Sequence, residues 1–316
     1  MAVRIHVGAA HGSPDPPMTE AAKKILLVKP KVPAPLDPDF SPYILGKLNY
    51  LEKLGDSSVF IEWALVRNDG CARGKLPVFP EHHPDISASV HITGVSIQEM
   101  IWQRGAYMLV LCGPASICAE LKAAFSPGGK FEFEVMTMPK VSGREEPWEV
   151  VIVPSVRELP LPRDTPQVCG KDANGCRLAF DLGKSDIKTV AVMDNEVKYS
   201  KETEWDVTNT DPEYHYKKIL DALLQAKEAL PRVDAIGGSA TGTISADNSA
   251  TWCDIFPNVP PAVYKEKVVG IFRRLAGELA GGVPLKVIND GEVTALAAVQ
   301  KIQAGNVLGI SMGSSE

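Results

Sequence analysis

Three short polar motifs, each at the end of an apolar run, constrain the fold of this 316-residue chain more than any other feature. Asp181–Lys188 lies between two strand-like runs, Ile236–Gly242 follows a third, and Val287–Glu292 ends a fourth and opens a helix. Short runs of apolar, β-branched residues that stop at Gly, Asp or Ser are typical of buried strands. From residue 176 onward the order βββαβαβα predicts a mixed sheet with helices packed against it.

The helices of this region are predicted from apolar residues at helical spacing. Thr210 or Asp211 caps the first helix, Pro212 lies in its first turn, and its apolar side continues to Leu230. A second helix is predicted over 263–279, with Gly281 as its stop. A third is predicted over 292–303, followed by a last strand over 307–311.

Taken together and in this order, the three motifs resemble those of the ROK and bacterial glucokinase group of sugar kinases, in the actin-like ATPase superfamily. The resemblance implies that 176–316 is the first, ribonuclease-H-like lobe of that fold. It implies ATP and Mg²⁺ as cofactors, and a sugar and a nucleotide as small-molecule ligands. The implied reaction is the phosphorylation of a sugar hydroxyl.

The resemblance gives the first motif the role of a hairpin turn that reaches the nucleotide phosphates. A glycine lets backbone N–H groups approach an oxyanion, a hydroxyl can donate to phosphate, and a carboxylate can hold Mg²⁺ through water. Lys184 stands where the family usually has a second glycine, and an ordinary hairpin turn is the alternative. The phosphate-binding residues implied are Asp181 (for Mg²⁺, indirectly), Gly183, Lys184, Ser185 and Lys188, with Gly313 and Ser314 in a second phosphate hairpin over 309–316.

The third motif resembles the Ile-Asn-Asp that ends a strand in glucokinases and hexokinases. By this resemblance Asp290 is the general base that takes the proton from the attacking sugar hydroxyl, and Asn289 binds sugar hydroxyls. The alternative, a helix cap, is compatible with it. The second motif resembles the ROK loop beside the sugar, and a tight turn is again the alternative. Its implied substrate-binding residues are Gly238, Ser239, Thr241 and Gly242, and the polar run 245–249 could add sugar-binding side chains.

The N-terminal half carries no recognised catalytic motif. Residues 1–42 are rich in Pro and Gly and predict an extended arm. Residues 43–160 predict an α+β domain, and 161–175 predict a linker. The helices predicted in this domain cover 43–54, 96–104 and 114–125, and the strands cover 58–66, 88–92, 107–112, 130–136 and 148–153.

Composition excludes several classes of protein. The net charge is −6 and there is no long basic block, so nucleic acid is not an expected partner. No apolar run approaches a membrane span of about 18 residues, and the first residues have no secretory pattern, so we expect a cytoplasmic protein without membrane contact. The six cysteines have no metal-binding spacing and predict reduced, buried thiols.

The resembling kinases clamp ATP between two lobes, and the motifs of the second lobe are absent from this sequence. We therefore expect the chain to be a piece of a longer protein and to be inactive as given. Two other functions stay open: a non-catalytic regulator that binds a sugar or a nucleotide, and a different ATPase of the same superfamily. A homodimer is the oligomeric state that the resemblance allows.

Overall fold

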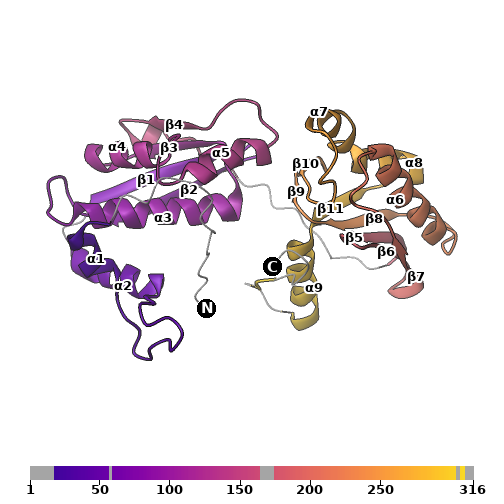
Figure 1. Ribbon diagram of the computed structural model, residues 1–316, viewed down its shortest axis with the longest axis horizontal. Helices are drawn as coiled ribbons and strands as arrows, with labels where there is room; N and C mark the ends of the chain where they lie inside the picture. The colour runs from indigo at the N-terminus through magenta and orange to yellow at the C-terminus, as the bar shows by residue number, and fades with distance from the viewer. Residues whose placement is uncertain (1–17, 57–58, 164–173, 304–306, 310–316) are drawn as a thin grey trace. The chain divides into compact units, whose positions relative to one another are not determined.

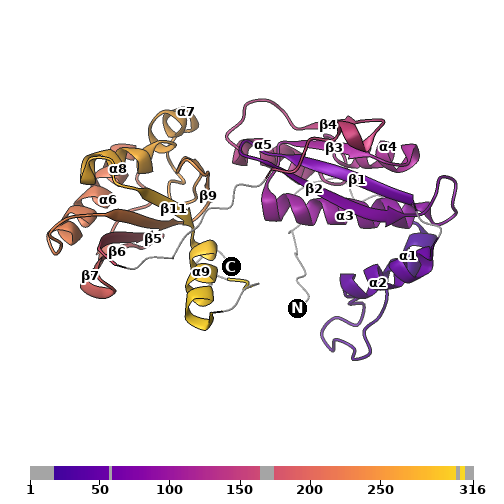
Figure 2. The same cartoon turned by 180° about the vertical axis from the view of Figure 1, so that it is seen from behind.

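The computed structural model describes residues 18–56, 59–163, 174–303 and 307–309. The chain divides into two compact units, Met1–Thr165 (unit 1) and Pro166–Glu316 (unit 2). Figures 1 and 2 show both units from opposite sides. None of the helices in the described ranges is long and apolar enough to cross a bilayer.

Unit 1 is an α+β unit. In chain order its elements are α1 (Glu20–Leu26), α2 (Tyr43–Leu54), β1 (Val59–Val66), β2 (Cys71–Val78), α3 (Ile86–Arg104), β3 (Met108–Cys112), α4 (Ala115–Ala124), α5 (Glu132–Val141), β4 (Glu149–Ile152) and the 3₁₀ turn η1 (Val156–Glu158).

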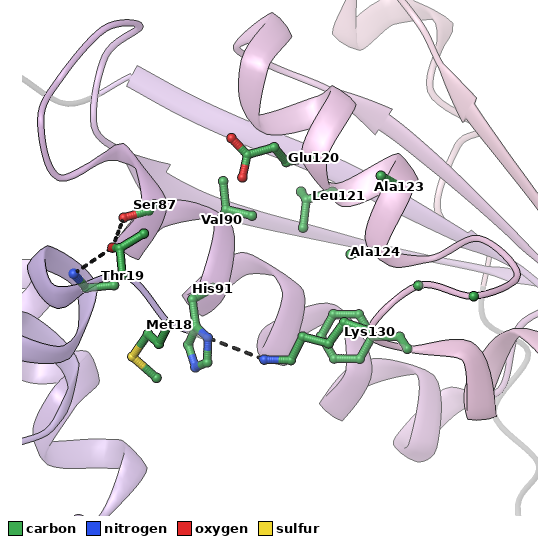
Figure 3. A pocket seen from close by; sticks show the side chains of 14 residues that line it. Met18, Thr19, Ser87, Val90, His91, Glu120, Leu121, Ala123, Ala124 and Lys130 are labelled. Carbon is green, nitrogen blue, oxygen red and sulfur yellow. Dashed lines mark hydrogen bonds between the residues drawn. The ribbon is translucent and has the colours of Figure 1, made fainter. Parts of the chain in front are cut away.

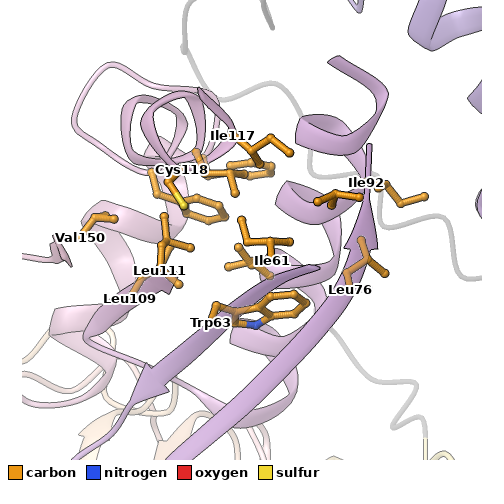
Figure 4. Close-up of a cluster of buried hydrophobic side chains, with 14 of the residues drawn as sticks. Ile61, Trp63, Leu76, Ile92, Leu109, Leu111, Ile117, Cys118 and Val150 are labelled. Carbon is orange, nitrogen blue, oxygen red and sulfur yellow. The ribbon is translucent and has the colours of Figure 1, made fainter. Parts of the chain in front are cut away.

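The sheet of unit 1 has the order β2-β1-β3-β4, with only the β3–β4 pair parallel. Alternate side chains of β1, Ile61, Trp63 and Leu65, face a core to which all five helices contribute. Figure 4 shows part of this core, including Ile117 and Cys118 from α4. A smaller cluster, with Ala64, Val110 and Leu159, lies on the other face of the sheet.

The structure corrects several predictions for unit 1. Residues 20–26 form a helix that buries Ala22, Ile25 and Leu26, so this part of the expected extended arm belongs to the core instead. Residues 88–92 lie inside the long helix α3, and most of 130–136 lies in α5, although both segments were expected to be strands. Strand β2 was not predicted, because Gly74 and Pro77 make its composition poor for a strand.

Unit 2 starts with three strands and then alternates helices with strands. Its elements are β5 (Cys176–Leu182), β6 (Asp186–Met193), β7 (Glu196–Glu204), α6 (Pro212–Lys227), β8 (Ala235–Ala240), β9 (Thr243–Ile244), β10 (Ala250–Trp252), α7 (Pro261–Val263), the π-helical turn η2 (Tyr264–Val268), α8 (Ile271–Ala280), β11 (Leu285–Asn289) and α9 (Asp290–Ile302).

The main sheet of unit 2 has the order β11-β8-β5-β6-β7. β5, β6 and β7 form an antiparallel meander, and β8 and β11 are added parallel to β5. This mixed sheet is consistent with the ribonuclease-H-like fold expected for 176–316. Asp211 caps α6, and Gly281 ends α8 in the left-handed conformation, as the sequence predicts.

The core of unit 2 lies on one face of this sheet. Leu178 and Phe180 of β5 pack there with Ile219 and Leu223 of α6 and with Phe272 of α8. α9 contributes no side chain to that core, and Figure 1 shows it apart from α6 and α8, leading from the end of β11. The expected helix over 263–279 is broken into α7, η2 and α8.

Candidate functional site

The parallel register brings the three sequence motifs to one edge of the sheet of unit 2. Leu182 at the end of β5 pairs with Ala240 of β8, and Ala240 pairs with Asn289 of β11. All three strands therefore end side by side, and the turns that follow them start from the same edge. Asp181 pairs with Ser239, and paired residues of parallel strands point to the same face, so these two side chains are neighbours.

The first motif is a tight hairpin turn between β5 and β6. The Gly183 N–H donates to the Asp186 carbonyl oxygen over 3.0 Å, and the Trp205 indole N–H donates to the Gly183 carbonyl over 2.9 Å. Lys184 and Ser185 form the exposed tip of the turn. The backbone is therefore fixed from inside the unit, whereas the tip faces solvent.

Asp186 also belongs to this turn, although the resemblance to the kinase motifs implies no role for it. Its carboxylate accepts a hydrogen bond from Lys188 Nζ over 2.6 Å and one from the Ser185 hydroxyl over 3.2 Å. The Lys188 ammonium lowers the pKa of Asp186, and Asp186 in turn raises the pKa of Lys188. Asp186 and Lys188 are two positions apart on one strand, so their side chains lie on the same face of the sheet. This spacing is the feature of the sequence from which the ion pair could have been predicted.

Lys188 lies between two carboxylates, because its Nζ is also 3.9 Å from Asp181 Oδ2. The charges of Asp181 and Asp186 offset those of Lys184 and Lys188, so the turn has no net charge. Lys188 adds a cation beside the turn, and in this structure that cation is bound to Asp186.

The second motif differs from its expected form. Gly238 and Ser239 lie within strand β8 and are buried, so the turn comes only at Thr241 and Gly242. A Cβ at Gly238 would be 2.3 Å from Cζ of Phe180, which means that this glycine makes room for a core side chain. We therefore correct the expectation that Gly238 lets a substrate approach the backbone.

Thr241 and Gly242 form a turn held by two side chains that are distant in the sequence. The Cys253 thiol donates to the Thr241 carbonyl over 2.7 Å, and the Asn289 amide donates to the Gly242 carbonyl over 3.0 Å. Gly242 has φ +115°, and an added Cβ would lie 2.2 Å from the Trp252 carbonyl oxygen, so only glycine fits there. Burial raises the pKa of Cys253 to about 12, so its thiol stays protonated.

The third motif places Asn289 and Asp290 where β11 becomes α9. Asn289 caps the helix, because its Oδ1 accepts from the Gly291 N–H over 2.9 Å. Asp290 is the first residue of α9 and is partly exposed, and its Oδ1 accepts from the same N–H over 3.0 Å. In a capping box the Asn289 side chain also accepts from the backbone N–H of Glu292, so its oxygen is fully used within the protein and one N–H of its amide is left.

The polar run 245–249 is a closed turn rather than a display of side chains. Asp247 accepts from Ser245, Ser249 and Arg273, and the Asn248 amide exchanges hydrogen bonds with the backbone of β11 at Leu285 and Val287. These side chains stabilise the edge of the sheet. They do not fit the expected role in sugar binding.

The expected second phosphate hairpin lies almost wholly outside the described residues, and this includes Gly313 and Ser314. Residues 307–309 have no regular structure, although a strand was expected from 307. The backbone of Gly309 contacts α9 so closely that a Cβ would lie 2.4 Å from the Ala295 nitrogen.

No group of three or more His, Cys, Asp or Glu side chains in the described ranges is arranged to hold a metal ion. Mg²⁺ bound to a nucleotide keeps most of its waters and needs only one or two protein carboxylates. The Asp181 side chain is 44% exposed at the sheet edge, which fits such an indirect role. The five cysteines of the described residues are buried, as the sequence predicts.

No protein-family model matches this chain, and no curated protein matches it either. Among solved structures, it is similar to a ROK hexokinase from Thermus thermophilus, with a TM-score of 0.31 and 21% identity over 40% of this chain and 38% of that one. It is also similar to a ROK family glucokinase from Streptomyces griseus in complex with glucose and AMPPNP. The TM-score is 0.32 and the identity is 19%, over 42% of this chain and 38% of that one. For a Ppx/GppA family protein from Aquifex aeolicus the TM-score is 0.25 and the identity is 13%, over 78% of this chain and 96% of that one.

The chain spans about two fifths of the length of these ROK structures. Identities and TM-scores at this level do not identify a family, so the function must be argued from the geometry of the site.

Proposed function

We propose that unit 2 is the lobe of an ATP-dependent carbohydrate kinase that positions the phosphates and the acceptor hydroxyl. The observation that carries this proposal is the common edge at which β5, β8 and β11 end. That register gathers Asp181, the turn at Thr241 and Gly242, and Asp290, which are residues of the three motifs that resemble those of ROK kinases.

The first turn provides the phosphate side of the proposed site. Its tip exposes the Lys184 ammonium and the Ser185 hydroxyl, which can both donate to phosphate oxygens. Lys188 is positioned by Asp186, and a phosphate group would compete with that carboxylate for the ammonium. Asp181 would hold Mg²⁺ through water, and the ion would neutralise charge on the phosphates.

Asp290 provides the acceptor side. A partly exposed carboxylate at the start of a helix can accept the proton of a sugar hydroxyl as that hydroxyl attacks the γ-phosphoryl group. Thr241 and Gly242 are held beside it by Asn289, which links the second motif to the third. Phosphoryl transfer depends mainly on such positioning, because the protein forms no covalent bond itself.

Nucleotide binding tests the phosphate side in the chain as it stands. We expect Mg²⁺–AMPPNP to shift the amide resonances of residues 181–188 with weak affinity, since one lobe alone provides half of a clamp. Asp181→Asn should weaken this effect, whereas Asp254→Asn, an exposed carboxylate outside the turn, should not. Resonance shifts confined to other parts of the chain would contradict the assignment.

Turnover tests the acceptor side in a protein that also contains a second lobe. Hexose-dependent release of ADP should fall by about 10²- to 10⁴-fold in Asp290→Asn, which removes the base and keeps an acceptor for the Gly291 N–H. Asp254→Asn again serves as the control. Full turnover in Asp290→Asn would overturn the role of Asp290.

A second candidate is an ATPase of the same superfamily that has no sugar acceptor. The observation in its favour is Asn289, whose amide is engaged by Gly242 and Gly291 instead of being presented to a sugar. ATP hydrolysis at the same rate with and without every hexose tested would select this function over the kinase.

A further inference from the structure

Unit 1 contains a buried carboxylate that has no cationic partner among the residues that the structure describes. Glu134 of α5 is 2% exposed, and its Oε1 accepts hydrogen bonds from the Gln98 amide over 2.6 Å and from the Trp102 indole N–H over 3.0 Å. Both donors are neutral. A buried charge is costly unless an opposite charge lies beside it, so a cation bound next to Glu134 would offset part of this cost.

The second carboxylate oxygen of Glu134 is accessible from outside. Gln98 and Trp102 are four residues apart on α3, so both reach Glu134 from one face of that helix, and both bind Oε1. Oε2 accepts no hydrogen bond from the described residues, and it is not one of the fully buried polar atoms that lack a partner. It therefore keeps some contact with solvent, although the residue as a whole is buried.

Two exposed aromatic rings lie beside this carboxylate. Trp102 is 42% exposed, and Phe133, which precedes Glu134 on α5, is 46% exposed. Their ring centroids are 6.0 Å apart and their planes differ by 22°, so the two rings are nearly parallel neighbours that join α3 to α5. Met136, one turn further along α5, is exposed as well. The buried charge thus has an aromatic surface at its side.

The described part of the chain does not supply a cation to this surface. None of its lysines and arginines lies over the ring of Trp102 or Phe133, whereas Lys75 lies over Phe60 in this way. Lys130, on the loop before α5, is engaged elsewhere. Its Nζ lies 3.4 Å from His91 Nδ1, at the open pocket between α1, α3 and α4 (Figure 3).

The indole of Trp102 connects the carboxylate to the aromatic surface electrostatically. The face of an aromatic ring is negative and its edge is positive, and Trp102 directs its N–H edge to Glu134. A cation over the exposed face is attracted by the ring itself. The charge of Glu134 adds to this attraction, and it is screened less than an exposed charge would be because the residue is buried.

The chemistry of these groups selects one class of cation. Metal ions and primary ammonium groups are strongly hydrated and need several oxygen atoms around them. A quaternary ammonium group donates no hydrogen bond and is recognised by aromatic faces. We propose that Glu134, Trp102 and Phe133 bind the quaternary ammonium group of a small molecule. This gives unit 1 a ligand-binding role that is independent of the kinase assignment.

An NMR titration of the whole chain with choline tests the proposal, with sodium chloride as the salt control. The indole N–H resonance of Trp102, assigned by its loss in Trp102→Phe, should shift and saturate at millimolar choline. The neutral control is dimethylbutanol, in which a carbon atom replaces the charged nitrogen. We expect it to bind at least about tenfold more weakly, because the attraction of the ring and the carboxylate for the charge is lost.

Variants at the site test the two contributions separately. Glu134→Gln removes the charge and keeps an acceptor for both donors, and it should weaken choline at least about fivefold without affecting dimethylbutanol. Phe133→Leu, at an exposed position, should weaken choline about threefold. Glu52→Gln, an exposed carboxylate of α2, is the matched control and should leave the affinity for choline unchanged.

A trimethyllysine peptide carries the same charged group, and we expect it to bind no more tightly than choline. A peptide that binds much more tightly would overturn the assignment to a small molecule. Equal affinities for choline and dimethylbutanol, an affinity for choline that is unchanged in both Glu134→Gln and Phe133→Leu, or no shift of the Trp102 resonance with choline beyond that with sodium chloride would each overturn the site itself.

Discussion

At the scale of single residues, Gly237 and Gly238 are neighbours in β8 with opposite requirements. A Cβ at Gly238 would collide with the ring of Phe180, whereas a Cβ at Gly237 would meet nothing within 4 Å. We predict that Gly238→Ala lowers the free energy of unfolding by about 1–3 kcal/mol, because the core must shift. Gly237→Ala should be neutral or stabilising by up to about 1 kcal/mol.

Urea titrations of the two glycine variants, followed by circular dichroism, give both values. A Gly238→Ala protein as stable as Gly237→Ala would show that Phe180 can move at no cost.

A second prediction at this scale concerns His215, which is fully buried among Trp205, Tyr214 and Phe256. Its Nε2 lies 2.9 Å from the Asn209 carbonyl and must donate to it, while Nδ1 has no hydrogen-bond partner among the residues that the structure describes. Burial lowers the pKa of His215 below its ordinary 6.5, although Asn209, Asp206 and Asp211 act in the other direction.

The unfolded chain therefore binds a proton near pH 6.5 that the folded chain rejects. The free energy of unfolding is therefore unaffected by His215 above that pH. Below it, the free energy of unfolding falls by at most about 1.4 kcal/mol per pH unit. His215→Phe should flatten this dependence in urea titrations, and His82→Asn, at an exposed histidine, should not. An unchanged slope in His215→Phe would contradict the prediction.

At the scale of elements, Asn289 joins the end of β11, the start of α9 and the turn at Gly242. We predict that Asn289→Ala costs about 1–3 kcal/mol, since it loses a helix cap and a hydrogen bond between loops. Asn289→Asp keeps the cap and loses only the donor to Gly242.

Amide hydrogen exchange separates these two roles of Asn289. The Gly291 amide should lose protection in Asn289→Ala and keep it in Asn289→Asp. Equal exchange at Gly291 in both variants would show that the cap is not what fixes the start of α9.

Elements also show where a local pattern is ambiguous. Phe131, Phe133 and Val135 alternate as in a strand, yet Phe131, Val135 and Met138 are buried at helical spacing while Phe133 is exposed. Phe131 stacks on Phe125, which lies at the end of α4. This contact selects the helical pattern, and a short window of sequence does not contain it.

At the scale of the whole molecule, the two units have hydrophobic cores that share no residue. We predict that Ile101→Ala destabilises only unit 1 and Leu223→Ala only unit 2, each by about 2–5 kcal/mol. Calorimetry of the whole chain should then show one of two transitions moving in each variant. One transition that moves as a whole in both variants would contradict independent folding.

Most elements of unit 2, and the strand ends at which its motifs lie, can be predicted from local sequence patterns. Local hydrophobic period, caps such as Asp211 and stops such as Gly281 act within a few residues, so they can be read from the chain. The sequence also placed Asp181 and Asp290 at strand ends, where parallel strands present their following turns. The partners of other side chains depend on the tertiary structure: Phe180 for Gly238, and Gly242 for Asn289. These partners are set by the register of strands distant in sequence, and local periodicity carries no information about that register.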